Sequence, residues 1–189
     1  NDSPAGPIPP TPTLMMVGTT DGYDAPPTGL TGEGKLLLVG DLTSGLGGSE
    51  LLSRTGGTDA FPALPDDPAG RVEAIARVAG LADVLAVHDV SHGGIVQTLA
   101  EMVTPDAGLT VDLPGPDGLG TLFSEAPGRV IVETTDVAEG EAAVGDHPVH
   151  RLGTADATGR LTVTVDEVEL TFATGDIRDR RAVIERELE

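Results

Sequence analysis

The chain has 189 residues, and its 31 acidic and 11 basic side chains give a formal charge of −20 at pH 7. A surface this acidic repels phosphate backbones and anionic headgroups, which argues against nucleic-acid and membrane partners. The chain has no Cys, which excludes disulfides and thiolate chemistry, and no apolar run reaches the roughly 20 residues of a membrane span. A hydrophobic content of 39% is enough for one domain with a real core.

The basic residues are unusual, because Lys35 is the only lysine and arginines supply the rest. Strong acidity with almost no Lys indicates adaptation to high salt; an acidic mesophilic domain from a GC-rich genome is the alternative. The chain starts at Asn1 with no initiator Met and no signal peptide. We therefore expect a piece of a longer, cytoplasmic protein.

The first half of the chain begins with an extended Pro- and Gly-rich lead-in over residues 1–34. Apolar runs and helical spacing predict the elements that lie in it and follow it. They are a strand at Leu14–Thr20, a strand at Lys35–Gly40, a helix at Glu50–Arg54, a helix at Asp67–Leu85 interrupted near Gly80, a strand at Val84–Val90 and a helix at Gly94–Val103.

The second half alternates less regularly between the two kinds of element. We predict strands at Leu109–Leu113, Arg129–Glu133, Val149–Thr154, Leu161–Val165 and Val168–Phe172, and helices at Gly120–Ala126, Val137–Val144 and Asp176–Leu188. Asp166-Glu167 joins the last two strands as a hairpin. This order predicts a single α+β domain over residues 1–189, with a mixed β-sheet flanked by helices.

Two glycine-rich loops resemble phosphate-binding motifs to different degrees. Gly29–Lys35 (GLTGEGK) is not a P-loop, because Leu36 follows the lysine and the next segment is a strand. Ser44–Glu50 (SGLGGSE) lies between a strand and a helix, where Gly47, Gly48 and Ser49 could surround an anion with backbone N–H groups. The alternative is a tight turn in which Ser49 caps the helix.

The strongest constellation is His88–Gly94 (HDVSHGG), where an apolar strand ends before a helix. Asp89 and Ser91 are two residues apart and point to the same side of an extended chain. Their oxygens suit Mg²⁺, while Gly93 and Gly94 at the helix start suit a phosphate group. The alternative, left open by the residues alone, is that Asp89 or Ser91 only caps the helix.

The remaining polar residues form no recognisable catalytic set. His88, His92, His147 and His150 do not have the spacing of a zinc motif, and exposed or strand-capping histidines explain them as well. We find no nucleophile, base and acid in combination, so no catalytic residue is assigned to this chain.

Several motifs, taken together and in order, resemble the last domain of the phosphoribosylformylglycinamidine synthase family, which belongs to the aminoimidazole ribonucleotide (AIR) synthetase superfamily. The resemblance spans essentially the whole chain. The motifs are Asn1-Asp2 with Pro7–Pro12, Leu14–Gly18, Gly34–Gly40, Leu46–Glu50, His88–Ile95 with Leu99–Met102, and Gly159–Val163. The resemblance implies an AIR-synthetase C-terminal-domain fold in the second half of a longer enzyme.

The resemblance also implies a reaction, in which ATP and Mg²⁺ drive the conversion of a formamide oxygen to an amidine nitrogen in purine biosynthesis. ATP phosphorylates the amide oxygen, and ammonia from a glutaminase displaces the phosphate. The implied partners are other domains of the same enzyme, the glutaminase subunit and a small accessory subunit. The catalytic histidine of the family lies outside the matched region, so the isolated chain is expected to be inactive.

Residue by residue, the resemblance assigns Asp89 to Mg²⁺ and Ser91 to Mg²⁺ and ATP, with Gly93 and Gly94 shaping the turn. His92 stands where the family usually has Asp, which favours a structural nucleotide pocket over a turnover site. Three alternatives remain: a non-catalytic scaffold domain of the same enzyme, another superfamily member (selenophosphate synthetase, thiamine-phosphate kinase or a hydrogenase maturation factor), and an independent acidic binding module.

Overall fold

The computed structural model describes residues 2–3, 6–7, 15, 17–18, 22, 24–115 and 117–182. Strands β1 (Asp2–Ser3) and β2 (Gly6–Pro7) pair with each other in antiparallel fashion. Most of the strand predicted at Leu14–Thr20 lies outside the described residues, and Met15, Val17 and Gly18 within it are exposed and not in a strand. The last residues of the predicted terminal helix, from 183 on, also lie outside them.

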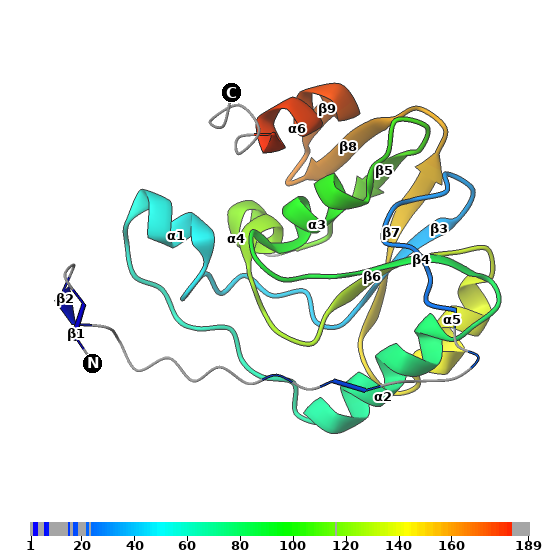
Figure 1. The fold of residues 1–189 in the computed structure, drawn as a ribbon, viewed down its shortest axis with the longest axis horizontal. Coiled ribbons are helices and arrows are strands. Elements are labelled where there is room, and N and C mark those ends of the chain that lie inside the picture. Colours follow the sequence, from blue (N-terminus) through cyan, green and yellow to red (C-terminus); the bar gives the residue numbers. More distant parts are fainter. Residues whose placement is uncertain are drawn as a thin grey trace.

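A mixed sheet of seven strands forms the centre of the described part of the chain (Figure 1), in the order β4-β6-β3-β7-β5-β8-β9. Neighbours are antiparallel except β5 and β8, which are parallel. The strands are β3 (Lys35–Val39), β4 (Val84–Asp89), β5 (Gly108–Asp112), β6 (Val130–Thr134), β7 (Val149–Asp156), β8 (Arg160–Val165) and β9 (Val168–Ala173). This confirms the predicted mixed sheet.

Helices cover both faces of the sheet. In Figure 1, α3 and α4 lie together on one side and α2 and α5 together on the other, and each pair is in contact. The helices are α1 (Glu50–Thr55), α2 (Pro68–Ala79), α3 (Gly94–Met102), α4 (Gly118–Phe123), α5 (Val137–Val144) and α6 (Thr174–Arg181). The arrangement is the predicted α+β architecture with flanking helices.

Strand β3 explains the two cores, since its apolar residues are buried on both sides. Leu36 and Leu38 belong to the core beneath α3, whereas Leu37 and Val39 belong to the core beneath α2 and α5. A continuous apolar run is typical of a strand covered on both faces. The run Lys35–Val39 therefore marks the centre of the fold.

The boundaries differ from the sequence-based expectations in places with local causes. Helix α2 begins at Pro68, with the Asp67 side chain accepting from the Gly70 N–H, and it ends at Gly80 instead of continuing to Leu85. Residue 85 already belongs to edge strand β4, whose Val87 N–H is bound by the Pro27 carbonyl. None of the helices in the described ranges is long and apolar enough to cross a membrane.

Candidate functional site

Strand β4 ends at the candidate Mg²⁺ ligand Asp89. Asp89 and Ser91 are exposed, while Val90 between them is 5% exposed and belongs to the core. Alternation of this kind places the Asp89 and Ser91 side chains on the same, solvent-facing side. Ser91 donates no side-chain hydrogen bond to any residue that the structure describes, so its hydroxyl is available to a ligand.

The start of α3 shows whether Asp89 or Ser91 caps the helix, which was the alternative to a Mg²⁺–phosphate site at residues 88–94. The N-cap residue is Gly93, in the left-handed region at φ 80°, and no side chain of the described residues caps the helix. Asp89 and Ser91 are therefore not capping residues. Gly94 must be a glycine because a Cβ there would lie 2.6 Å from the Leu122 carbonyl oxygen at the end of α4.

The second candidate turn, at residues 47–49, combines packing with capping. Ser49 is the N-cap of α1, and its hydroxyl accepts from the Leu52 N–H at 3.3 Å, as the capping alternative predicted. A Cβ at Gly47 would lie 2.6 Å from the backbone of Ala60. Close packing of the loop that contains Ala60 thus accounts for the glycine.

A carboxylate of the chain itself joins the two candidate turns. Glu125 Oε1 accepts the Gly93 N–H and the Glu50 N–H, each at 2.8 Å. The tertiary structure therefore brings the turn before α3 next to the turn before α1, although they are far apart in sequence. The Gly93 N–H that was expected to be free for phosphate is occupied by Glu125.

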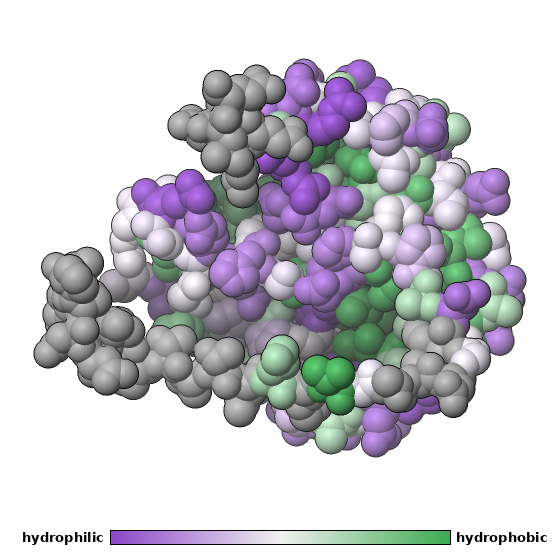
Figure 2. Space-filling model, viewed as in Figure 1, coloured by the Kyte–Doolittle hydropathy of each residue, from purple (hydrophilic) through white to green (hydrophobic). Residues whose placement is uncertain are grey.

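A cavity of about 550 Å³ opens beside the two turns. It is lined by residues of α1, α3 and the segment before α3, and by one ring from α4: Glu50, Leu51, Arg54, His92, Gly93, Val96, Gln97, Glu101 and Phe123. The residues that colour as hydrophilic over α1 and α3 surround this part of the face in Figure 2. The lining combines charged side chains with the apolar side chains of Leu51, Val96 and Phe123, a mixture that is typical of small-molecule sites.

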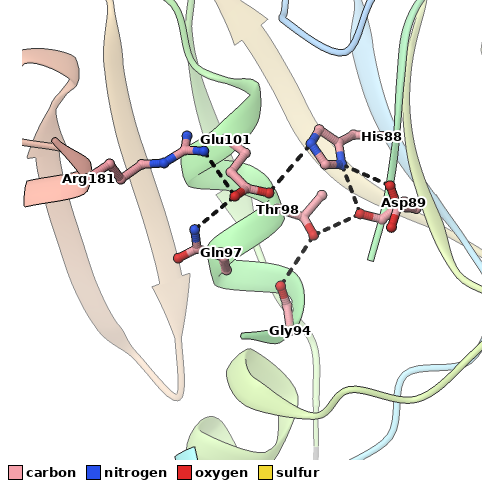
Figure 3. A network of polar contacts seen from close by, with 7 residues as sticks. All are labelled: His88, Asp89, Gly94, Gln97, Thr98, Glu101 and Arg181. Carbon is pink, nitrogen blue, oxygen red and sulfur yellow. Dashed lines mark hydrogen bonds and ion pairs between the residues drawn. The ribbon is translucent and has the colours of Figure 1, made fainter. Parts of the chain in front are cut away.

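A polar network supports the strand end from behind (Figure 3). His88 Nδ1 lies 2.9 Å from the Asp89 carbonyl oxygen, and the Thr98 hydroxyl donates to the same oxygen at 3.1 Å. On its other side, His88 Nε2 is 3.5 Å from Glu101, which also binds Arg181. The network ties β4, α3 and α6 together, and it includes the Asp89 carboxylate, whose Oδ1 lies 3.5 Å from His88 Nδ1 while the side chain is 69% exposed.

The loop that resembles a P-loop surrounds a carboxylate. The backbone N–H groups of Thr31, Gly32, Glu33 and Gly34 all donate to Glu133, at 2.8 to 3.1 Å. Glu133 is fully buried in β6. Its carboxylate stands where a phosphate would be in a true P-loop, so the rejection of that motif agrees with the structure.

The oxygen atoms at the end of β4 can supply part of the ligands of a Mg²⁺–nucleotide complex. Asp89 and Ser91 offer oxygen ligands, which Mg²⁺ prefers. Within the described ranges, however, no three His, Asp or Glu side chains are close enough to hold a metal ion. The two oxygens fit a site that is completed by other ligands.

Sequence reasoning missed Glu125 and Glu133. The signal for Glu133 was a lone carboxylate in the apolar strand RVIVE, because a buried charge requires partners. Glu125 lies in a short polar loop between α4 and β6 and carried no comparable signal. Its importance follows from tertiary contacts alone.

Comparison with known families and proteins gives consistent matches. Residues 32–166 match the family model described as AIR synthase related protein, C-terminal domain. The chain is 56% identical over its full length to phosphoribosylformylglycinamidine synthase subunit PurL of Natronomonas pharaonis and 54% identical to that of Halobacterium salinarum. It spans about a quarter of the length of these relatives, 27% and 26% respectively.

Solved structures share the fold at low sequence identity. The Thermotoga maritima PurL complexed with ATP has a TM-score of 0.61 and 15% identity, and the match covers 81% of this chain and 27% of that chain. The hydrogenase maturation protein HypE in complex with ATP has a TM-score of 0.54 and 18% identity, covering 78% of this chain and 52% of that chain.

Proposed function

The chain belongs to the family described as AIR synthase related protein, C-terminal domain. From this premise we propose that it forms part of a phosphoribosylformylglycinamidine synthase. The observation that carries the proposal is 56% identity along the whole chain to a PurL subunit. In that reaction, the amide oxygen of the glycinamide group in formylglycinamide ribonucleotide attacks the γ-phosphorus of ATP, and ADP leaves. Ammonia then adds to the activated carbon, and phosphate leaves with the former amide oxygen.

Within that enzyme, the edge formed by Asp89, Ser91, Gly93 and Gly94 contributes to a Mg²⁺–nucleotide site. The Asp89 carboxylate and the Ser91 hydroxyl supply oxygen ligands, and the glycine turn, which has no side chains, lets the nucleotide approach the backbone closely. Bound Mg²⁺ would supply charge neutralisation at the phosphates. The ATP-complexed PurL and HypE structures, which share this fold, support a nucleotide role.

The turn of Gly47, Gly48 and Ser49 directly precedes Glu50, which lines the cavity, and within this proposal it contacts the same ligand. The remaining ligands come from other domains of the subunit, since the chain spans 27% of its relative. A glutaminase subunit and a small accessory subunit complete the enzyme, in line with the PurLQS complex of Thermotoga maritima. The proposal includes a cytoplasmic location. It also includes adaptation to high salt, which the salt-loving sources of the relatives support.

One observation favours a second candidate function, a structural nucleotide pocket or scaffold domain within the same enzyme. Glu125 occupies the Gly93 N–H, and the glycines at positions 47 and 94 are required by packing. A structural pocket would not need a second acidic side chain beside Asp89, and His92 stands at the position where the family usually has Asp.

Substitution of Asp89 in the full-length subunit tests the site. Asp89→Asn keeps the shape but removes the charge, so we expect Mg·ADP to bind about tenfold more weakly in a calorimetric titration, as for loss of one charge-assisted contact. Asp112→Asn is the matched control, because Asp112 is an exposed aspartate at the end of β5. Equal affinity of wild type and Asp89→Asn would reject the site.

Turnover distinguishes the two candidate functions. With ammonium as nitrogen donor, a catalytic site predicts that Asp89→Asn loses phosphate release along with nucleotide binding. A structural pocket predicts retained turnover with lower thermal stability that ADP no longer restores. The 189-residue chain alone is expected to release no phosphate above background, and turnover by it would contradict the assignment to one part of a larger enzyme.

A further inference from the structure

The two candidate turns are held together by one side chain, and we propose that Glu125 is a positioning residue for the nucleotide site. The inference rests on the proposed function for its ligand, and on the structure for its geometry. Glu125 itself faces backbone N–H groups of the chain, so its role is to place the turn 91–94 against the turn 47–49.

The contact is a shared acceptor. One atom, Glu125 Oε1, accepts the N–H of Glu50, the first residue of α1, and the N–H of Gly93, the N-cap of α3, both at 2.8 Å. A charged acceptor makes such bonds shorter and stronger than a neutral one. Both donor residues line the cavity, as does Phe123 two residues before Glu125. Any shift at Glu125 therefore changes the width of the cavity.

The loop that carries Glu125 is anchored from the buried side. Arg129, 2% exposed, donates through its guanidinium to the carbonyl oxygens of Ser124 and Ala126, the residues on either side of Glu125. Rotation of the loop would break these bonds in the interior, where they are costly to lose. Glu125 is thus a rigid support for the two turns.

Helix α1 depends on this support more than α3 does. None of its six residues is buried, whereas α3 buries Ile95, Leu99 and Met102 in the core. Among the described residues, and apart from the Ser49 cap at the helix start, the Glu125 bond is the hydrogen bond that links the first residue of α1 to the rest of the domain. Loss of Glu125 should release α1 and the turn 47–49 first.

Hydrogen–deuterium exchange of the full-length subunit tests the geometry without any use of activity. We expect Glu125→Ala to raise exchange about tenfold in peptides that contain Glu50 and Gly93, and to leave β3 and β6 protected. Glu125→Gln keeps an oxygen acceptor and should restore most of the protection. Glu169→Ala, at an exposed site on β9, is the control. Unchanged exchange in both peptides of Glu125→Ala would refute the contact.

Kinetics of the same variants tests the link to the nucleotide. With ammonium as nitrogen donor, Glu125→Ala should raise the KM for ATP about tenfold while kcat changes less than about twofold, and Glu125→Gln should recover most of the difference. Increased exchange with an unchanged KM would overturn the role in nucleotide positioning. If the full-length subunit has no synthase activity at all, the proposed function fails, while the exchange data still decide on Glu125.

Discussion

Glu133 shows how one residue can organise a loop. It lies in the apolar strand β6 with no exposed surface, and it accepts the backbone N–H groups of residues 31–34 as well as the Thr31 hydroxyl. A buried charge is tolerated when it is this well hydrogen-bonded. The loop therefore serves as a structural anchor for the segment before β3.

Glu133→Gln tests this role. The amide nitrogen would replace one carboxylate oxygen, and the Thr31 N–H that now donates to Oε2 would face another donor. We expect the free energy of unfolding to fall by about 2 kcal/mol. Denaturant melts check this, with the exposed Glu169→Gln as the control, and equal losses in the two variants would contradict the anchor.

The folding stability of the domain is expected to depend on pH through His150. Burial lowers its pKa below the ordinary value, and the nearby Asp41 opposes this shift. Since the unfolded chain then takes up the proton more readily, stability is constant above the unfolded pKa of about 6.5 and falls as the pH drops through it.

The pH slope identifies the residue responsible. We expect urea melts in ~2 M KCl to show lower stability at pH 5.5 than at pH 7.5. His150→Gln has no proton to take up and should flatten this difference. The same slope in the variant and the wild type would exclude His150 as a source.

At the scale of elements, the hairpin between β8 and β9 was predicted and is confirmed, with Val165 opposite Val168. Its two turn residues, Asp166 and Glu167, have φ angles of 48° and 64°, in the left-handed region. Such angles at both positions are typical of a type I′ turn, in which glycine is favoured. The hairpin forms in spite of its turn residues, because the Thr- and Val-rich strands pair well.

Glu167→Gly should therefore stabilise the domain by about 0.5–1 kcal/mol, because it removes the steric strain of a Cβ atom in the left-handed backbone conformation. The matched control is Glu169→Gly, the same substitution within strand β9, which should destabilise by a similar amount. Thermal melts of the two variants should shift in opposite directions. Shifts of the same sign would contradict the explanation.

At the scale of the whole molecule, the charge of −20 dominates. Hydrophilic residues cover much of the face in Figure 2, and the excess of acidic side chains over basic ones makes the surface repel itself, which opposes the compact state. Salt screens this repulsion, with a Debye length that falls from about 10 Å at 0.1 M to about 3 Å at 1 M.

We therefore expect the melting temperature to rise from ~0.1 M to ~2 M KCl. Sucrose at matched osmolality is the control, because it is excluded from the protein surface, as some salts are, but it does not screen charge. A melting temperature that is unchanged or lower in high salt would contradict adaptation to salt.

The elements and the family could be predicted from the sequence, because both depend on local patterns. The helix Val137–Val144 was predicted with its observed bounds, and the strand at Lys35–Gly40 within one residue. Apolar periodicity and glycine or capping residues act within a few positions, so they can be recognised along the chain. The positions of Asp89 and Ser91 at a strand end also followed from such a pattern.

The partners across the fold were decided by the tertiary structure. Strand β3 pairs with β6 and β7 from the second half of the chain, and Glu125 and Glu133 bind N–H groups 32 to 102 residues away. Every residue except proline carries the same backbone N–H, so no side-chain pattern marks which ones a distant carboxylate will meet. Packing of the sheet and its helices determines that choice, and with it the shape of the candidate site.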